Sequence, residues 1–551
     1  MGVPGFFAWL LKQDIKKSII LKDLVDKKIQ GLYLDSNCLF HPQCFKLLSF
    51  YPGETDVNKL ENLMIKRIIN YINYLIDYVK PTELIYIAVD GVAPVAKINQ
   101  QRKRRYKSVI DNQIKYNLQR KYHIPHNESW SNIVITPGTN FMVKLDKALI
   151  KLKNSNKKIM YSSYQEPGEG EHKILQYIKQ NIKPDTQDFN VIYGLDADLI
   201  FLTFASGVNN LLLLRELQHL DKNHKEKDIL THPVTDVAEQ LCYVSIDNTI
   251  NTLNQYIIDK LAVSKLIESE LTNFKNDFIF ICYFLGNDFI PHIPSIDIKK
   301  GGMDMIINAY VHAIERTGEY IIQDKTKLLL NPVTFKLFLS YLVDEEQNYF
   351  KQTLPKYYSK NKYCQATNNY DIEMWELDNM INLERFMKID PKSLELDPFY
   401  LTSPQVTLDE SKVKYYEHYF KNQQVTNIVK SFYEILFWTM DYYFNSCKCW
   451  ITHYKYNHAP FITDIYNNID MINKFNFTVN NPISVEQQLL SVVPPYYKHI
   501  LSSKLQQYYQ DTNLRFMLPN RFKLDCHYKD MFWAVNPELP YLDIDIIKNN
   551  I

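Results

Sequence analysis

Three short apolar runs early in the chain each end at an aspartate, and this pattern constrains the fold more than any other feature of the sequence. The runs cover residues 31–35, 84–90 and 191–196, and they end at Asp35, Asp90 and Asp196. Continuous apolar runs of this length are typical of buried strands in a parallel sheet. The carboxyl ends of such strands meet at one edge, where α/β proteins place their active sites. If the three strands are neighbours, the sequence predicts that their aspartates lie close together.

Helical patterns alternate with these runs. Residues 57–80, 141–153 and 171–181 carry apolar side chains at helical spacing, and this alternation predicts a parallel α/β domain flanked by helices. Another helical pattern, at 249–288, ends just after the apolar run that precedes Gly286. Over 326–407 the periodicity weakens, and we expect a poorly structured connector or an extended wrap. A second apolar and aromatic block follows, with a helix expected at 424–445. We therefore divide the chain into regions 1–325, 326–407 and 408–551.

Four further acids join the three aspartates. Glu169 and Glu171 lie at a turn that opens a helix, Asp198 follows Asp196 by two residues, and Asp288 ends the 249–288 pattern. Carboxylates repel one another, so gathering them is costly unless cations compensate. Mg²⁺ and Mn²⁺ prefer such oxygen ligands, and two cations roughly 4 Å apart hydrolyse phosphodiesters. Each acid alone is better explained as a helix cap or a solvated loop end, whereas the seven together favour a site for two cations.

A basic segment at 97–107 follows Asp90. It carries six positive charges and no acid, and on a helix one face would present Lys97, Gln101, Arg104 and Arg105. Forked guanidinium groups together with an ammonium and an amide suit a terminal phosphate. By itself the segment is better explained as a solvated helix surface or a weak nuclear-import patch. Its position after Asp90 favours a phosphate pocket beside the acids.

Two aromatic side chains complete the set of candidate site residues. His41 follows Asp35 by six residues, and Trp450 lies in the second apolar block. Stacking on such rings holds single-stranded nucleic acid without sequence preference. Because the chain contains 40 tyrosines, most of its aromatic residues must serve the core or the surface, and each of these two taken singly has that explanation as well.

Composition restricts the class of protein. Basic and acidic residues number 63 and 62, so a polyanionic partner must be recognised by local clusters and not by net charge. No apolar stretch is long enough to span a bilayer, and no signal peptide is evident. The eight cysteines are scattered, without the spacing of a zinc site. We expect an intracellular protein in a reducing compartment, with the cytoplasm favoured over the nucleus.

With these residues in place, the chain closely resembles the Xrn family of 5′→3′ exoribonucleases, within the metal-dependent 5′-nuclease superfamily. The order of the motifs is that of the family. The matching segments are Met1-Gly-Val-Pro-Gly-Phe, Leu-Tyr-Leu-Asp35-Ser-Asn37, Asp90-Gly-Val-Ala-Pro-Val-Ala-Lys97, Pro-Gly-Glu169-Gly-Glu171-His-Lys, Gly-Leu-Asp196-Ala-Asp198 and Gly286-Asn-Asp288-Phe-Ile-Pro-His. The second block matches at Trp450, at His-Ala-Pro460-Phe and at Trp533-Ala-Val. Trp450 aligns with the first tryptophan of the family's Ser-Trp-Ser-Trp stretch, and Thr452 occupies the position of the second.

The resemblance implies a fold and a set of roles. The fold would be a PIN-like 5′-nuclease sheet flanked by helices, with a second, mostly helical region wrapping the active site. All seven acids would be catalytic and would bind two Mg²⁺ or Mn²⁺ ions, with Asn37 beside them. The basic residues of the 97–105 segment would bind a 5′-phosphate, while His41 and Trp450 would stack on bases. The substrate would be single-stranded RNA with a 5′-monophosphate, degraded processively to mononucleotides in RNA decay.

The resemblance also leaves alternatives. A DNA-directed 5′ nuclease or flap endonuclease shares the superfamily, but no glycine-rich helix–hairpin–helix stretch follows Asp288. A catalytically inactive RNA-binding scaffold is disfavoured because all seven acids are present. We expect a monomer that does not bind membranes, and protein partners are left open. Large cytoplasmic members of the family carry long C-terminal extensions, whose functions we expect to be missing here or supplied by another chain.

Overall fold

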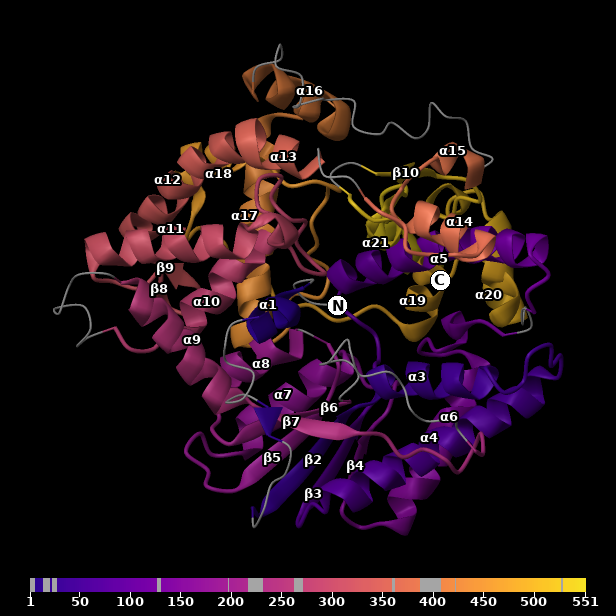
Figure 1. Cartoon of the computed structure of the whole chain (residues 1–551). Helices are drawn as coiled ribbons and strands as arrows, with labels where there is room; N and C mark the ends of the chain where they lie inside the picture. Colours follow the sequence, from indigo (N-terminus) through magenta and orange to yellow (C-terminus); the bar gives the residue numbers. More distant parts are fainter. Residues whose placement is uncertain are drawn as a thin grey trace.

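A mixed sheet forms the lower part of the molecule, as drawn in Figure 1, in the computed structural model. The structure describes residues 5–12, 20–21, 27–125, 130–196, 198–216, 231–261, 271–358, 362–386, 408–421, 423–526 and 529–551. Within these residues the sheet has seven strands in the order β1-β7-β6-β5-β2-β3-β4. Their bounds are β1 Ile20–Leu21, β2 Ile29–Asp35, β3 Leu84–Ala88, β4 Ile159–Ser162, β5 Phe189–Tyr193, β6 Leu211–Glu216 and β7 Leu241–Ser245. Strands β6, β5, β2, β3 and β4 run parallel, and β7 is antiparallel to both neighbours.

Helices cover both faces of the sheet, which explains why its strands are apolar without alternation. In β2, for example, Leu32 and Leu34 belong to the core on one face and Tyr33 to the core on the other. One face packs against α3 Ser36–Leu48, α4 Val57–Val79 and α6 Asn140–Ser155. The other packs against α7 Gly170–Asn181, α8 Asp198–Ser206, α9 Ile246–Lys260 and α10 Lys275–Cys282. The predicted α/β class is confirmed, as are the three neighbouring strands and the helices expected at 57–80, 141–153 and 171–181.

A helical layer continues the second of these cores. Its helices are α1 Phe6–Lys12, α11 Gly302–Thr317, α12 Pro332–Asn348, α17 Val425–Phe444 and α18 Ile462–Asn467. A π-helix Tyr349–Thr353, α13 Leu354–Tyr358 and α16 Leu408–Phe420 share a smaller core beside it, whereas α14 Asn369–Asp378 and α15 Leu383–Phe386 pack in another small core with α5 (Val95–Lys121). A short hairpin of β8 Ile322–Asp324 and β9 Leu329–Leu330 lies beside the helical layer. The helix expected at 424–445 is confirmed as α17. The pattern at 249–288 is helical in two parts, α9 and α10, and residues 262–270 lie outside the described residues.

The expectation of poor structure after residue 325 is wrong for much of that segment. Asn331 caps α12 by accepting the backbone N–H groups of Val333 and Thr334, and Pro332 occupies its first position. Phe335, Phe338 and their neighbours Leu339 and Leu342 form a fully buried face at helical spacing. This periodicity was hidden by the many polar residues around it. Residues 387–407 lie outside the described residues.

Helix α5, Val95–Lys121, is enclosed by elements from the C-terminal end of the chain (Figure 1). They are α19 Val485–Val492, α20 Ser503–Gln507, α21 Ile544–Asn550 and the hairpin of β10 Lys523–Asp525 and β11 Asn536–Glu538. Val95 and Ile98 join the core around α19, whereas Ile114 and Leu118 join a smaller core with Leu524. The distant C-terminal segment therefore holds α5 in place above the carboxyl edge of the sheet.

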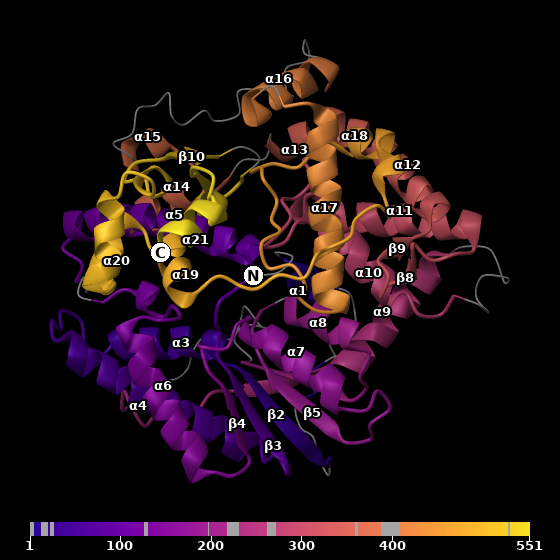
Figure 2. The ribbon, with the colours of Figure 1, turned by 180° about the vertical axis from the view of Figure 1, so that it is seen from behind.

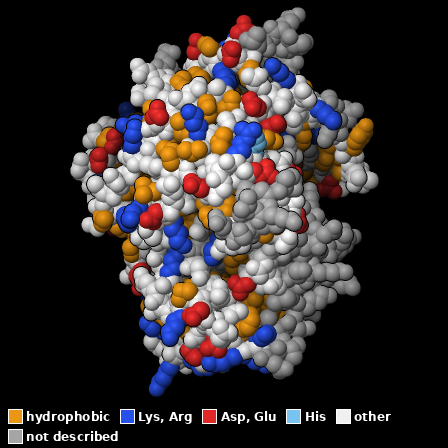
Figure 3. Space-filling model, turned by 90° about the vertical axis from the view of Figure 1, so that its left-hand side faces the viewer, with side chains coloured by type: hydrophobic (Ala, Val, Ile, Leu, Met, Phe, Trp, Pro, Cys, Tyr) orange, Lys and Arg blue, Asp and Glu red, His pale blue; other side chains and the backbone are white. Residues whose placement is uncertain are grey.

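The surface carries charges of both signs. On the face shown in Figure 3, blue and red side chains are interspersed among the coloured residues, in keeping with the balanced composition. None of the helices in the described part of the chain has the length and apolar character needed to cross a membrane.

Candidate active site

The predicted convergence of strand ends occurs. Asp35 is the last residue of β2, Asp90 follows β3, and Asp196 follows β5, with β2 lying between the other two strands. The carboxylate of Asp35 is buried. Burial raises its pKa well above the ordinary value, and the nearby charges of Asp90, Asp196 and Glu169 raise it further. Four of the seven acids therefore share one buried volume at the carboxyl edge of the sheet.

The turn before α7 brings in the two glutamates. Glu169 is the residue before α7 and Glu171 lies in its first turn, and both side chains are buried. The backbone N–H of Gly170 donates to Oδ1 of Asp90 at 2.7 Å. A Cβ at this glycine would lie 2.9 Å from Oδ1 of Asp35. The helix can therefore approach the strand ends this closely only because residue 170 has no side chain.

The last two acids come from α8 and from the loop after α10. Asp198 opens α8 and is buried. Burial raises its pKa to about 7, and Asp288 and Asp196 contribute in the same direction. Although burial alone would raise the pKa of Asp288, the ammonium of Lys97 holds it below its usual value. All seven predicted acids thus belong to one group, which we call the acid cluster.

Lys97 lies inside the acid cluster. Its Nζ is 2.7 Å from Oε1 of Glu169 and 2.7 Å from Oδ2 of Asp288. Burial would lower the pKa of this lysine, but the surrounding carboxylates raise it well above the ordinary value. One ammonium cannot compensate seven carboxylates, and Oε2 of Glu171 and Oδ1 of Asp198 are buried without a hydrogen-bond partner among the described residues. Buried, unpaired carboxylate oxygens are suitable ligands for hard divalent cations.

Sequence reasoning missed two members of the site. His172 offers a ring nitrogen within 4.8 Å of carboxylate oxygens of Glu169 and Glu171. Tyr442, on α17, donates its hydroxyl to Oε2 of Glu169 at 2.9 Å, and its ring packs on His172 with centroids 3.7 Å apart. Figure 2 shows α17 descending to α7 and α8, where these contacts form. The Glu-Gly-Glu-His order was a signal for the histidine, whereas no local pattern marks one tyrosine among 40.

The remaining predicted residues lie around the first turns of α5. Gln101 and Arg105 are buried, Arg104 is exposed, and Nη1 of Arg105 is buried without a hydrogen-bond partner among the described residues. Burial and the neighbouring Arg104 lower the pKa of Arg105 to about 9. Burial and the charges of Arg104 and Arg105 lower the pKa of His41, on α3, to about 4. These residues form a basic group next to Asp90.

Asn37 and Trp450 lie at the edges of this arrangement. Oδ1 of Asn37 accepts the backbone N–H of Asp90 at 3.3 Å, which places the amide beside the acid cluster. The backbone carbonyl of Trp450 accepts the N–H of Val95 at 2.8 Å. Trp450 is half-buried and lies at the start of α5, but no contact joins its ring to His41 among the described residues.

Two family models match this chain. One, described as the XRN 5′–3′ exonuclease N-terminus, matches residues 1–217. The other, described as the Xrn1 helical domain, matches residues 269–394 and 405–550. The chain belongs to the Xrn family of 5′–3′ exonucleases. The resemblance drawn from its motifs is confirmed.

Curated Xrn relatives align over nearly the whole chain. Human 5′–3′ exoribonuclease 1 is 28% identical over 98% of this chain and 33% of its own length. The 5′–3′ exoribonuclease 2 homolog of Drosophila melanogaster is 27% identical over 98% of this chain and 70% of its own length. The 5′–3′ exoribonuclease 1 of Saccharomyces cerevisiae is 25% identical over 98% of this chain and 42% of its own length. The chain therefore spans about a third of the human relative that it matches.

The site of this Xrn protein combines both matched regions. The first model covers six members of the acid cluster, and the second covers Asp288, Tyr442 and Trp450. The ion pair between Lys97 and Asp288 and the hydrogen bond from Tyr442 to Glu169 join the two regions. The acid cluster and its contacts therefore draw on residues of both regions.

Proposed function

We propose that this protein is a metal-dependent hydrolase that degrades 5′-monophosphorylated RNA in the 5′→3′ direction, processively and to mononucleotides, in RNA decay. One observation carries the proposal. The acid cluster lies next to the basic group of α5, and Lys97 of the same helix reaches into the cluster through its ion pairs with Glu169 and Asp288. The relatives are named as exoribonucleases, which supports RNA as the substrate.

The acid cluster would hold the metal ions. The seven carboxylates are the proposed ligands of two Mg²⁺ or Mn²⁺ ions, and the unpaired oxygens of Glu171 and Asp198 support this role. When bound, such a pair of cations activates the attacking water and stabilises the leaving oxygen. Lys97 would orient Glu169 and Asp288 and limit the repulsion within the cluster. Asn37 would fix the backbone at Asp90.

The basic group would hold the end of the RNA. Lys97, Gln101, Arg104 and Arg105 are the proposed ligands of the 5′-phosphate, and His41 and Trp450 would stack on the first bases. A phosphate pocket at a fixed distance from the metal ions measures one nucleotide, and an enclosed pocket excludes caps and triphosphates by size. Each cleavage creates a new 5′-phosphate, so the same contacts serve successive cleavages.

The two halves of the chain would divide this work. Residues 1–325 carry the acids and the basic group, and residues 408–551 would complete the pocket around them. We further propose that the protein acts as a monomer inside the cell, in the cytoplasm. All eight cysteines are free, which supports a reducing compartment.

Degradation of RNAs that differ only at the 5′ end tests the proposal. We expect rapid loss of a 5′-monophosphate RNA with Mg²⁺, slow loss of triphosphate, capped or hydroxyl forms, and none with EDTA. The products should be mononucleotides. If a matched 5′-phosphorylated DNA were degraded equally well, the proposed substrate would be any nucleic acid with this end and not RNA alone. Endonucleolytic fragments would favour a flap endonuclease. Binding of RNA without cleavage under all conditions would identify an inactive scaffold.

Replacing Tyr442 by phenylalanine should weaken metal binding. The change removes the hydrogen bond to Oε2 of Glu169 and leaves the ring on His172. Losing a hydrogen bond that orients a metal ligand typically costs about 10- to 100-fold in metal affinity or activity. We therefore expect a roughly tenfold higher Mg²⁺ concentration at half-maximal rate. Tyr433→Phe is the matched control, since that buried hydroxyl on the same helix donates to the carbonyl of Ile465 instead. Equal Mg²⁺ requirements in the two variants would rule out this role for Tyr442.

A further inference from the structure

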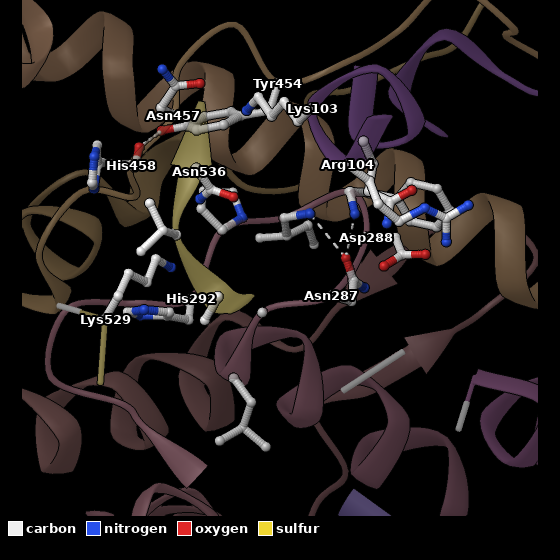
Figure 4. Close-up of a pocket in the computed structure, with 18 of the residues that line it drawn as sticks. Lys103, Arg104, Asn287, Asp288, His292, Tyr454, Asn457, His458, Lys529 and Asn536 are labelled. Atoms are coloured by element: carbon white, nitrogen blue, oxygen red, sulfur yellow. Dashed lines mark hydrogen bonds between the residues drawn. The ribbon is translucent and has the colours of Figure 1, made fainter. Parts of the chain in front are cut away.

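A cavity of about 660 Å³ lies beside the acid cluster, and the proposed function assigns it no role. Asp196 and Asp288 form part of its wall, so it borders the acids directly. Figure 4 shows side chains from α5, from the loop after α10 and from the C-terminal half of the chain around it. The labelled side chains include Lys103, Arg104, His292, Asn457, Lys529 and Asn536. This cavity lies in the part of the site where the two matched regions meet.

Helix α5 separates the cavity from the basic group. Gln100, Lys103 and Lys107 line the cavity, but Gln101 and Arg105 do not. At about 100° per residue, the first three positions lie on a different face of the helix from the last two. Arg104 lines the cavity as well, so its side chain stands at the junction. The cavity and the basic group thus lie on different faces of α5, and Arg104 belongs to both.

The wall of the cavity carries charges of both signs, and several of its cations have no ion pair among the described residues. Among the described residues no ion pair joins an acid to Lys103, Arg104, Lys299 or Lys529. By contrast, Lys107 pairs with Asp111, and Lys300 pairs with Asp297 and Asp530. Burial lowers the pKa of Lys103 to about 8 and also lowers that of Lys529. Cations held in this way are stabilised when an anion enters.

We propose that this cavity binds the nucleoside 5′-monophosphate that each cleavage releases, an inference that rests on the proposed function. Hydrolysis breaks the bond between phosphorus and the 3′ oxygen. The hydroxyl of water joins the phosphorus and its proton reaches the 3′ oxygen, so a mononucleotide leaves and the shortened strand carries the new 5′-phosphate. That strand can advance only after the basic group is vacated. The released mononucleotide, a dianion, would pass Arg104 on its way from the basic group to Lys103 and Lys529 in the cavity. The strand remains bound during this transfer.

The size and lining of the cavity fit this ligand better than a strand. Small-molecule sites typically measure about 300–1,000 Å³, whereas a strand requires a groove with repeated contacts along the backbone. The amides of Asn457 and Asn536 offer both donors and acceptors, so they can accept any of the four bases. An exit used by every product must tolerate all of them.

Equilibrium binding tests the site without any catalytic step. AMP and UMP are titrated into the full chain in EDTA, with adenosine as the phosphate-free control. We expect the double variant Lys103→Ala, Lys529→Ala to bind both nucleotides about tenfold more weakly. Lys115→Ala, which removes an exposed lysine farther along α5, should bind them normally. Because AMP can also enter the basic group, the titration is repeated in Arg105→Ala. The proposal would be overturned if Arg105→Ala abolished nucleotide binding while the Lys103→Ala, Lys529→Ala double variant bound both nucleotides normally.

A kinetic experiment separates product release from strand binding. Asn457→Trp partly fills the cavity without changing the acid cluster or the basic group. In rapid-quench reactions on end-labelled RNA, we expect a normal first cleavage and later cleavages slowed about tenfold. Equal slowing of the first and later cleavages would show that the strand occupies the cavity, and no slowing would show that the product leaves elsewhere; either result overturns the proposal. If the unchanged protein cleaves no RNA, the proposed function fails, and nucleotide binding still decides whether the cavity is a site.

Discussion

Asp198→Asn is expected to abolish RNA hydrolysis while stabilising the metal-free protein. The substitution removes a proposed metal ligand and keeps the shape of the side chain. Loss of a principal electrostatic group in an active site costs about 10²–10³-fold in rate, so we expect at least that reduction. The rate is measured with 5′-monophosphate RNA and saturating Mg²⁺.

The stability change has a definite pH dependence. In the folded, metal-free protein, burial raises the pKa of Asp198 from 3.8 to about 7. The protonated form is therefore favoured by folding, and stability is lost as the pH rises from about 4 to 7. Asparagine cannot ionise, so the melting temperature of the variant in EDTA should exceed that of the parent increasingly over this window and remain higher above it. Mg²⁺ should then stabilise the parent more than the variant.

An exposed acid provides the control for this experiment. Asp77 lies on the outer side of α4, and Asp77→Asn should leave the rate, the melting temperature and the response to Mg²⁺ unchanged. Full activity of Asp198→Asn would contradict the assignment of this carboxylate to the metal site. If the melting temperature of Asp198→Asn at high pH in EDTA were lower than that of the parent, the acid cluster would not be repulsive in the absence of metal ions.

Strand-end reasoning predicted the acid cluster well because it depends on topology alone. Asp35, Asp90 and Asp196 needed only parallel neighbouring strands to converge, and the apolar runs before them indicated such strands. The glutamates and Asp288 were found through motifs and not through geometry. Their contact with the strand ends depends on the bare backbone of Gly170 and on the ion pairs of Lys97, which connect residues far apart in the sequence.

The contributions of the helical half were the hardest to predict. Tyr442 reaches Glu169 across 273 positions of sequence, and neither residue carries a local sign of this contact. The cavity behind α5 was missed for a related reason. The pattern of charges at 97–107 showed one basic face. Lys103 and Lys529 line the same cavity only because the β10–β11 hairpin packs on α5. Local periodicity describes elements, whereas a site between regions depends on how they pack.

Arg104→Ala is expected to remove most of the preference for a 5′-monophosphate over a 5′-hydroxyl. Hydrogen bonds to charged groups contribute about 1.5–3 kcal/mol, which corresponds to roughly 10- to 100-fold. The ratio of kcat/KM values for the two RNAs should therefore fall by about that factor, mainly because the phosphorylated substrate loses affinity. Arg105→Ala should have the same effect, since its unpaired Nη1 lies next to Arg104 in the basic group.

The hydroxyl substrate makes this prediction sharp. An arginine that serves only the general attraction of RNA would change kcat/KM for both substrates equally, and the ratio would stay constant. Lys115→Ala removes an exposed charge from the same helix and should behave in that way. The acid cluster remains intact in all three variants, so the rate on the hydroxyl RNA reports whether hydrolysis itself is preserved. A constant ratio in both arginine variants would place the phosphate elsewhere, whereas a reduced ratio with hydroxyl activity retained would assign these guanidinium groups to recognition of the 5′ end and the acids to cleavage.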